Sequence, residues 1–130
     1  MDALDALLGA EKNVEKDVYI KRLDVHFKIK ALDGQTINKL RDAATHYVGK
    51  GAKRRAEFND EEFKASIISA ACVNLDFGNR KLLDKYGAKD ANDCVYKALL
   101  AGEVMLLHEE VLRLSGFDED DDEELEEVKN

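Results

Sequence analysis

Two short runs of alternating apolar and polar residues constrain the fold more than any other feature of the sequence. Apolar residues alternate with polar ones over residues 18–20 and again over residues 25–29. A period of two, with β-branched and aromatic residues, is typical of strands with one buried face. The runs therefore predict a β-hairpin that turns at Leu23 and Asp24. Because a two-stranded hairpin is at best marginally stable alone, its apolar face must lie on helices.

The rest of the body has helical spacing. The 130 residues include no proline, where about 5% is usual, and this favours helices. Apolar residues recur every three or four positions in five segments, which are 34–48, 59–73, 79–86, 91–100 and 102–115. We therefore predict a mainly α domain over residues 17–117, with about five helices and the N-terminal hairpin packed on them.

Several helix ends carry recognisable signals. Asp33 or Thr36 is suited to cap the first of these helices, and Asn59 with Glu62 predicts a capping box at the second. Gly116, followed by Phe117, predicts a Schellman ending after residue 115.

The first 16 residues are predicted to form a flexible arm. The sequence DALDALL places leucines on one side of a short amphipathic helix, and these are Leu4, Leu7 and Leu8. One or two helical turns are marginal in water unless they dock on something. The arm therefore either frays or packs on a neighbouring molecule.

The acidic C-terminal segment carries the whole charge imbalance. Residues 118–130 hold nine acids and one lysine, which equals the net charge of −8 of the chain. The acids that open it are Asp118, Glu119, Asp120, Asp121, Asp122, Glu123 and Glu124. Such a segment buries too little apolar surface to offset its ordering entropy, so we expect a disordered tail. It either promotes solubility, contacts a basic partner or prevents self-association.

The chemistry-bearing residues do not form a catalytic pattern. The three histidines are scattered, and no phosphate-binding glycine loop, nucleophile elbow or C-x-x-C motif is present. Cys72 and Cys94 lie in apolar helical patterns and are expected to be free, buried thiols. No apolar run is long enough to span a membrane, and no signal peptide is recognised. We therefore expect a cytosolic protein that is not an enzyme and has no metal or cofactor.

One basic segment interrupts the neutral body, between the second and third predicted elements. Its cations are Lys50, Lys53, Arg54 and Arg55, in a glycine-containing stretch expected to be a loop. The absence of a neighbouring aromatic platform and the net charge of −8 argue against nucleic-acid binding. The loop is either simply solvated or a contact for an acidic tail, its own or a neighbour's.

The last helix is more apolar than one buried stripe requires. The surplus either packs into the core from several sides or forms a surface for another chain. Together with the arm, it supplies the candidate partner-binding residues, which are Leu4, Leu7, Leu8, Val104, Met105, Leu106 and Leu112.

The order of these segments resembles a known family. The hairpin VYIKRLDVHFKIKAL is followed by F-x-x-x-I-I-x-A-A-C-V over residues 63–73, KYG over 85–87, L-x-x-G-E from Leu100, and LSGF before the acidic end. This pattern is similar to that of tail assembly chaperones of contractile-tailed Gram-positive phages and defective prophages.

The resemblance implies a role in tail assembly. Such chaperones bind and solubilise the long tape measure protein and help to recruit tail tube subunits in the host cytoplasm. They are absent from the mature virion, and self-association into spirals or dimers is within the family's range. Neither nucleic acid nor a membrane is an expected partner.

Two other classes of function remain open at this level. One is a structural tail or head-completion protein. The other is an acidic inhibitor or nucleic-acid mimic, which needs negative charge spread over the body, whereas here the body is neutral.

Overall fold

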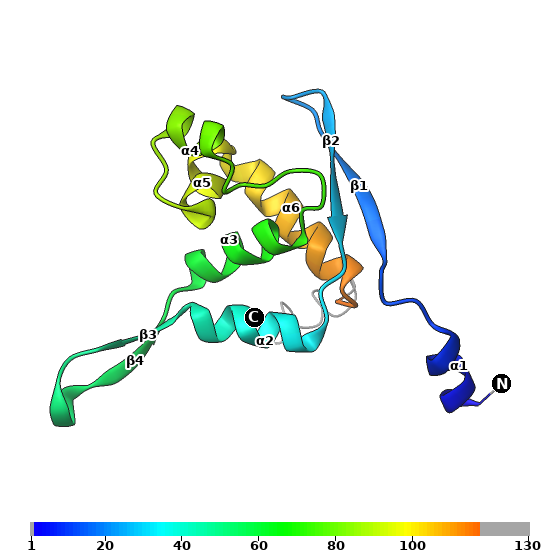
Figure 1. The fold of residues 1–130 in the computed structure, drawn as a ribbon, viewed down its shortest axis with the longest axis horizontal. Coiled ribbons are helices and arrows are strands. Elements are labelled where there is room, and N and C mark those ends of the chain that lie inside the picture. Colours follow the sequence, from blue (N-terminus) through cyan, green and yellow to red (C-terminus); the bar gives the residue numbers. More distant parts are fainter. Residues whose placement is uncertain (1, 118–130) are drawn as a thin grey trace, which may run out of the picture.

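The computed structural model describes residues 2–117, in which a helical body carries two β-hairpins and a separate N-terminal helix (Figure 1). The elements are α1 (Ala3–Gly9), β1 (Glu15–Ile20), β2 (Val25–Lys30), α2 (Gly34–Ala43), β3 (Thr45–Val48), β4 (Arg55–Phe58), α3 (Asp60–Ala71), α4 (Arg80–Tyr86), α5 (Ala91–Ala98) and α6 (Ala101–Leu114). A short 3₁₀ turn, η1, spans Gly51–Lys53. The predicted hairpin and five body helices are all present, so the fold is mainly helical as predicted, with a second hairpin in addition.

The first hairpin packs one face on the helices, as its alternation predicts. β1 and β2 are antiparallel, with Val18 opposite Phe27 and Ile20 opposite Val25. Three of these side chains are buried, whereas Val25, the residue next to the turn, is 46% exposed. The hairpin lies along α6, and β2 also pairs with the end of α3, where Val73 donates to the Lys28 carbonyl at 2.7 Å (Figure 1).

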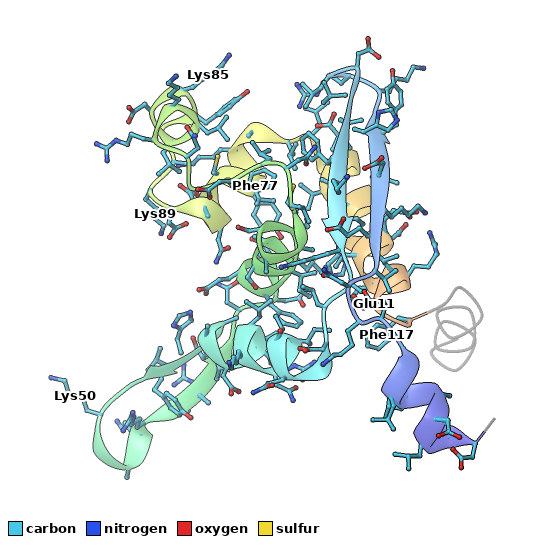
Figure 2. All side chains as sticks on the ribbon, turned by 45° about the vertical axis from the view of Figure 1, so that its right-hand side comes forward. Glu11, Lys50, Phe77, Lys85, Lys89 and Phe117 are labelled. Carbon is cyan, nitrogen blue, oxygen red and sulfur yellow. The ribbon has the colours of Figure 1, made fainter. Side chains whose placement is uncertain are left out.

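The core is centred on α3. Five of its residues are buried, and three of them are the small Ala65, Ser66 and Ala71. Small side chains let neighbouring helices approach closely, and α3 contacts α2, α5 and α6. Phe77 lies in this interior, with its ring edge-on to Phe27 at 6.4 Å between centroids (Figure 2).

Both cysteines are free, as predicted. Cys94 is fully buried on α5, and Cys72 is half-buried where α3 meets β2. Burial raises the pKa of both thiols, because a thiolate is poorly solvated in an apolar environment.

The second hairpin corrects two predictions. The helix predicted over 34–48 ends at Ala43, and the predicted loop contains strand β4, which pairs with β3. Thr45, Tyr47 and Val48 are β-branched or aromatic residues that favour a strand. Gly49 has φ of +87°, and a Cβ there would lie 2.6 Å from the Lys53 carbonyl oxygen. A glycine is therefore required where the chain turns.

The predicted helix ends are largely confirmed. Asp33 caps α2 by accepting from the Thr36 amide at 2.8 Å. This hydrogen bond, together with the nearby Lys12, lowers the pKa of Asp33 to about 2. α6 ends in a Schellman motif, since Phe117 donates to the Leu112 carbonyl at 3.0 Å and Gly116 has φ of +108°.

Asn59 caps α3, but the predicted reciprocal contact from Glu62 is absent. Asn59 accepts from the Glu62 amide at 3.0 Å. Its own N–H donates to the Ala44 carbonyl at 2.8 Å, and the Glu62 carboxylate pairs with His46 instead. The first of these alternative partners is the C-cap residue of α2, and the second, His46, belongs to the unpredicted hairpin.

Two elements project from the body in both views (Figures 1 and 2). One is α1, which has no buried residue, and the other is the β3–β4 hairpin, with Lys50 at its far end. The predicted arm is shorter than expected, because β1 already begins at Glu15. The predicted acidic tail, 118–130, lies outside the described residues.

Candidate functional site

An apolar groove lies between the β1–β2 turn and the start of α6. Its volume is about 620 Å³. It is lined by Tyr19, Ile20, Lys21, Arg22, Leu100, Gly102, Glu103 and Leu106. We refer to this feature as the turn groove.

Arg22 and Glu103 hold the two walls of the turn groove together. The Arg22 guanidinium donates from Nε and Nη2 to the two carboxylate oxygens of Glu103, each at 2.8 Å. Arg22 also donates to the Ala98 carbonyl at 3.2 Å, and Glu103 accepts from the Leu100 amide at 2.7 Å. The bidentate pair raises the pKa of Arg22 and lowers that of Glu103, so both stay charged at neutral pH.

The apolar side chains of the turn groove are exposed to solvent. Leu100 is 58% exposed, Tyr19 45% and Leu106 38%, and Met105, which precedes Leu106 on α6, is 63% exposed. The Tyr19 hydroxyl donates to the Asp24 carboxylate at 2.6 Å, which fixes the ring and raises the pKa of Tyr19. An apolar groove in which Tyr19, Arg22 and Glu103 already have polar partners is suited to binding an apolar segment of another chain.

The predicted partner-binding residues separate into three groups. Leu4, Leu7 and Leu8 are highly exposed on α1. Leu106 lines the turn groove, and the preceding residue, Met105, is exposed. Leu112 is half-buried against the core. Val104 was wrongly chosen as a surface residue, because it is only 7% exposed and belongs to the core.

The sequence prediction missed Tyr19 and Leu100. Tyr19 occupies the outward position of β1, where an aromatic residue is the available signal. Leu100 lies in the short connection before α6, and an apolar residue in a connection is a weak signal. Their proximity depends on the Arg22–Glu103 contact, which joins positions 81 residues apart.

The predicted basic residues lie at the far end of the second hairpin. Lys50, Lys53, Arg54 and Arg55 are all exposed. Contrary to the sequence prediction, an aromatic neighbour is present, because the Arg54 guanidinium lies 4.8 Å from the centre of the Tyr47 ring. Arg55 pairs with Glu57 at 2.9 Å. Contact with an acidic tail was one of the two alternatives for this loop, and the acidic residues 118–124 lie outside the described part of the chain.

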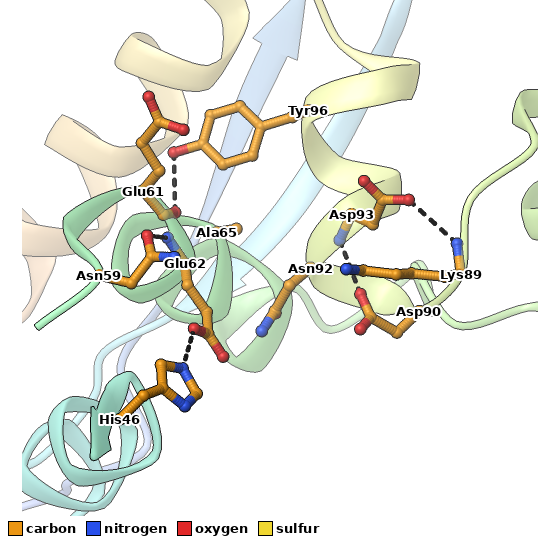
Figure 3. Close-up of a pocket in the computed structure, with 10 residues that line it drawn as sticks. All are labelled: His46, Asn59, Glu61, Glu62, Ala65, Lys89, Asp90, Asn92, Asp93 and Tyr96. Carbon is orange, nitrogen blue, oxygen red and sulfur yellow. Dashed lines mark hydrogen bonds and ion pairs between the residues drawn. The ribbon is translucent and has the colours of Figure 1, made fainter. Parts of the chain in front are cut away.

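A second, polar cleft of about 540 Å³ separates the start of α3 from the start of α5 (Figure 3). Its side chains mostly bind each other or the backbone. His46 Nε2 lies 2.6 Å from the Glu62 carboxylate, and the Tyr96 hydroxyl donates to the Glu61 carbonyl at 2.9 Å. Asp90 caps α5. These contacts give the cleft a structural role in joining the two helices.

Asp93 completes the polar cleft. Its carboxylate accepts from the Lys89 amide at 3.0 Å and pairs with Lys97 at 2.9 Å, and these contacts lower the pKa of Asp93. Within residues 2–117, no group of three or more histidine, cysteine or acidic side chains is arranged to hold a metal ion. No helix in the same part of the chain is long and apolar enough to cross a membrane.

The comparison with known families decides the identity of the chain. The phage XkdN-like tail assembly chaperone proteins match residues 4–129, nearly the whole sequence. The chain belongs to this family. The resemblance found in the sequence motifs is thereby confirmed for this phage tail assembly chaperone.

A solved structure supports the fold of the chaperone. The crystal structure of the protein yqbn is similar with a TM-score of 0.65, covering 91% of this chain and 98% of that one at 19% sequence identity. At this identity, the likeness shows a shared fold only. None of the curated proteins compared with the chain matches it.

Proposed function

We propose that this tail assembly chaperone binds and solubilises the tape measure protein through the turn groove, and helps to recruit tail tube subunits. The main observation behind this proposal is an exposed apolar groove, whose walls are joined by Arg22 and Glu103, on a member of a tail assembly chaperone family. A long client rich in coiled coil offers many apolar helical faces. Helix-in-groove contacts to such faces are individually weak, so the client is released when the tube closes around it.

The groove chemistry fits a binding role. Leu100, Leu106 and Tyr19 provide apolar contact area, and the thioether of Met105 adapts to irregular partners. Arg22 and Glu103 satisfy each other, so an arriving apolar segment does not leave either of these two charges unpaired. We therefore propose that the chaperone acts by binding and not by catalysis.

Charge supports the solubilising role. Residues 118–130 carry the whole net charge of −8, while the body is neutral. Like charges on neighbouring loaded chaperones repel each other, which opposes aggregation of the client. The acidic segment is also the candidate contact for a tail tube subunit.

Co-expression with the tape measure protein tests the client assignment. We expect the client to be soluble and to co-purify with the wild-type chaperone. The double variant Leu100→Gln with Leu106→Gln should bind at least about tenfold more weakly, because each leucine loses apolar contact area. Tyr47→Gln is the matched control, since Tyr47 is also exposed but lies on the second hairpin.

Two results would reject this proposal. One is a client that is equally soluble without the chaperone, and the other is a double variant that retains the client while matching the wild type in thermal unfolding. We further expect mass spectrometry of purified virions to find the chaperone absent, as a transient assembly factor should be. Its presence there would favour a structural tail or head-completion role.

A further inference from the structure

The β3–β4 hairpin has one aromatic face that is open to solvent. Tyr47 lies opposite Ala56, and Thr45 lies opposite Phe58. Residues directly opposite each other share a face of the sheet, so both aromatic rings lie on the same face. Tyr47 is 64% exposed and Phe58 is 47% exposed. A two-stranded hairpin is at best marginally stable by itself, so a segment that covers these rings would stabilise it.

Two arginines lie over the rings that carry this face towards the body. The Arg54 guanidinium lies 4.8 Å from the centre of the Tyr47 ring. Phe58 meets Phe63 edge-on at 5.4 Å, and the Arg41 guanidinium lies 5.4 Å from the Phe63 centroid. A guanidinium stacked on a ring keeps N–H groups at its edge, which can bind carboxylates. We call this row of three rings and two arginines the aromatic ridge.

The aromatic ridge suits an acidic segment that also contains apolar residues. Besides Arg54, the hairpin exposes the cations Lys50, Lys53 and Arg55. The chain itself contains a segment of this kind, because residues 123–128 read EELEEV. Its four glutamates match the arginines in charge, and its leucine and valine match the rings in polarity.

The acidic tail, residues 118–130, follows a part of α6 that is fixed beside the start of α2. The Ser115 hydroxyl accepts from the Leu32 amide at 2.9 Å. The other end of α2 leads directly into the β3–β4 hairpin, which projects away from the body (Figure 1). The tail is therefore attached near one end of α2, and the aromatic ridge lies at the other.

The lengths of the segments bring residues 123–128 to the ridge. From Leu32, the path along α2 is about 18 Å to Arg41 and, continued along β3, at most about 35 Å to Tyr47. An extended chain from Phe117 reaches residue 123 after about 20 Å and residue 128 after about 38 Å. The earlier acids, 118–122, are too close to Phe117 to reach Tyr47.

We propose that residues 123–128 of the acidic tail dock on the aromatic ridge of the same molecule. Attachment to the same chain gives the tail an effective concentration on the order of millimolar at the ridge, which favours it over acidic segments of other proteins. The acidic segment is also the proposed contact for a tail tube subunit. Docking therefore makes a tube subunit compete with the ridge for the tail. The competition rests on the function proposed above, whereas the docking itself does not.

Photo-cross-linking in the full-length chain tests the docking. With Tyr47 replaced by p-benzoylphenylalanine, we expect illumination to link position 47 to residues 123–128, as mapped by mass spectrometry. Tyr19 is the control position, since it is also exposed but belongs to the first hairpin. In an equal mixture of ¹⁴N- and ¹⁵N-labelled chains, each linked pair of peptides should carry a single label, because the contact lies within one molecule.

Charge variants in the cross-linking chain locate the contact. The ridge variant is Arg54→Gln, and the tail variant is Glu123→Gln, Glu124→Gln, Glu126→Gln and Glu127→Gln. Each should lower the yield at least about threefold, because several weak ion pairs act together. The matched control removes the same number of charges nearer to α6 and should lower the yield less. It is Asp118→Asn, Asp120→Asn, Asp121→Asn and Asp122→Asn.

Four results would overturn the docking. They are no link from position 47 to residues 123–128, an equal yield from position 19, randomly mixed labels, or a yield that the tail variant leaves unchanged while its thermal unfolding matches the wild type. Rings flanked by cations also suit single-stranded nucleic acid. A wild type that binds a single-stranded oligonucleotide as tightly as the tail variant would therefore show that the ridge is uncovered.

Binding of the tube subunit separates the docking from the competition. If both hold, Arg54→Gln binds the tube subunit more tightly than the wild type, because its tail is released. Weaker binding by Arg54→Gln would show that the hairpin itself contacts the tube subunit, and the competition would be rejected. If neither protein binds the tube subunit, the proposed recruitment fails, while the cross-linking of purified chaperone still decides the docking.

Discussion

The two hairpins share antiparallel pairing of consecutive strands but have opposite environments. In β1–β2, the inward side chains Val18, Phe27 and Ile29 are buried against the helices. In β3–β4, no residue is buried and all four residues of β4 are exposed. The first hairpin is part of the core, whereas the second is attached only at its base.

The attachment of the second hairpin is correspondingly sparse. At its base, the Asn59 amide donates to the Ala44 carbonyl at 2.8 Å, and the Phe58 ring meets Phe63 edge-on at 5.4 Å. The Arg41 guanidinium lies over the Phe63 ring, 5.4 Å from its centroid. The comparison shows that helices covering one face, more than pairing between strands, make a hairpin a stable part of this protein.

The largest expected effect comes from emptying the buried face of the first hairpin. Ile29 is 0% exposed, so Ile29→Ala should lower the free energy of unfolding by about 2–5 kcal/mol. Tyr47→Ala in the second hairpin, where the side chain is 64% exposed, should cost less than about 1 kcal/mol. Urea unfolding measures both, and equal costs would contradict the distinction between the hairpins.

An intermediate effect is expected at the turn of the second hairpin. Gly49→Ala combines a strained φ of +87° with a Cβ only 2.6 Å from the Lys53 carbonyl oxygen, and the strain alone costs roughly 1–2 kcal/mol. We expect faster amide exchange over Arg55–Phe58, while α3 keeps its protection. Gly51→Ala is the control, because Gly51 also has a positive φ, of +59°, but its Cβ would meet nothing within 4 Å. It should therefore accelerate exchange less than Gly49→Ala. Accelerated exchange throughout α3 would argue that the second hairpin belongs to the core.

The smallest expected effect distinguishes the helices that follow the two hairpins. Asp33 caps α2 with a carboxylate whose folded pKa is about 2, below its ordinary 3.8, whereas Asn59 caps α3 with a neutral amide. The Asp33 carboxylate therefore stabilises the fold above pH 3.8 and loses this contribution as the pH falls towards 2. Asp33→Asn keeps a good cap and removes the titration.

Thermal unfolding between about pH 5 and pH 2 measures this effect. The wild type should exceed Asp33→Asn in Tm at the higher pH, and the difference should narrow as acid is added. A difference that is constant with pH would mean that the carboxylate is not responsible.

Local patterns predicted much of the body. The alternation around Val18 and Phe27 identified the first hairpin and its buried face, and Gly116 marked the end of α6 correctly. These features depend on a few neighbouring residues, which a sequence displays directly. The number of body helices followed from helical spacing in the same way.

The second hairpin was missed because its strands are four residues long and have no buried face. The helical spacing of Ile37, Leu40 and Ala44 continues to Val48, so it suggested one long helix. The β-branched and aromatic residues before Gly49 were the signal for a strand instead. The turn groove depends on the pairing of Arg22 with Glu103 across the chain. Helical periodicity marked α6 as too apolar, but it did not separate exposed Met105 from buried Val104.

The alkylation rates of the two cysteine thiols can report how the folded protein opens. Cys94 is fully enclosed, while Cys72 lies half-buried at the place where α3 ends against β2. An alkylating reagent attacks the thiolate, so its reaction with Cys94 has to await an opening of the helical core. Cys72 is already partly exposed, and separation of the first hairpin from α3 should expose it further. The relative alkylation rates therefore indicate whether this chaperone loosens at its hairpin before it unfolds as a whole.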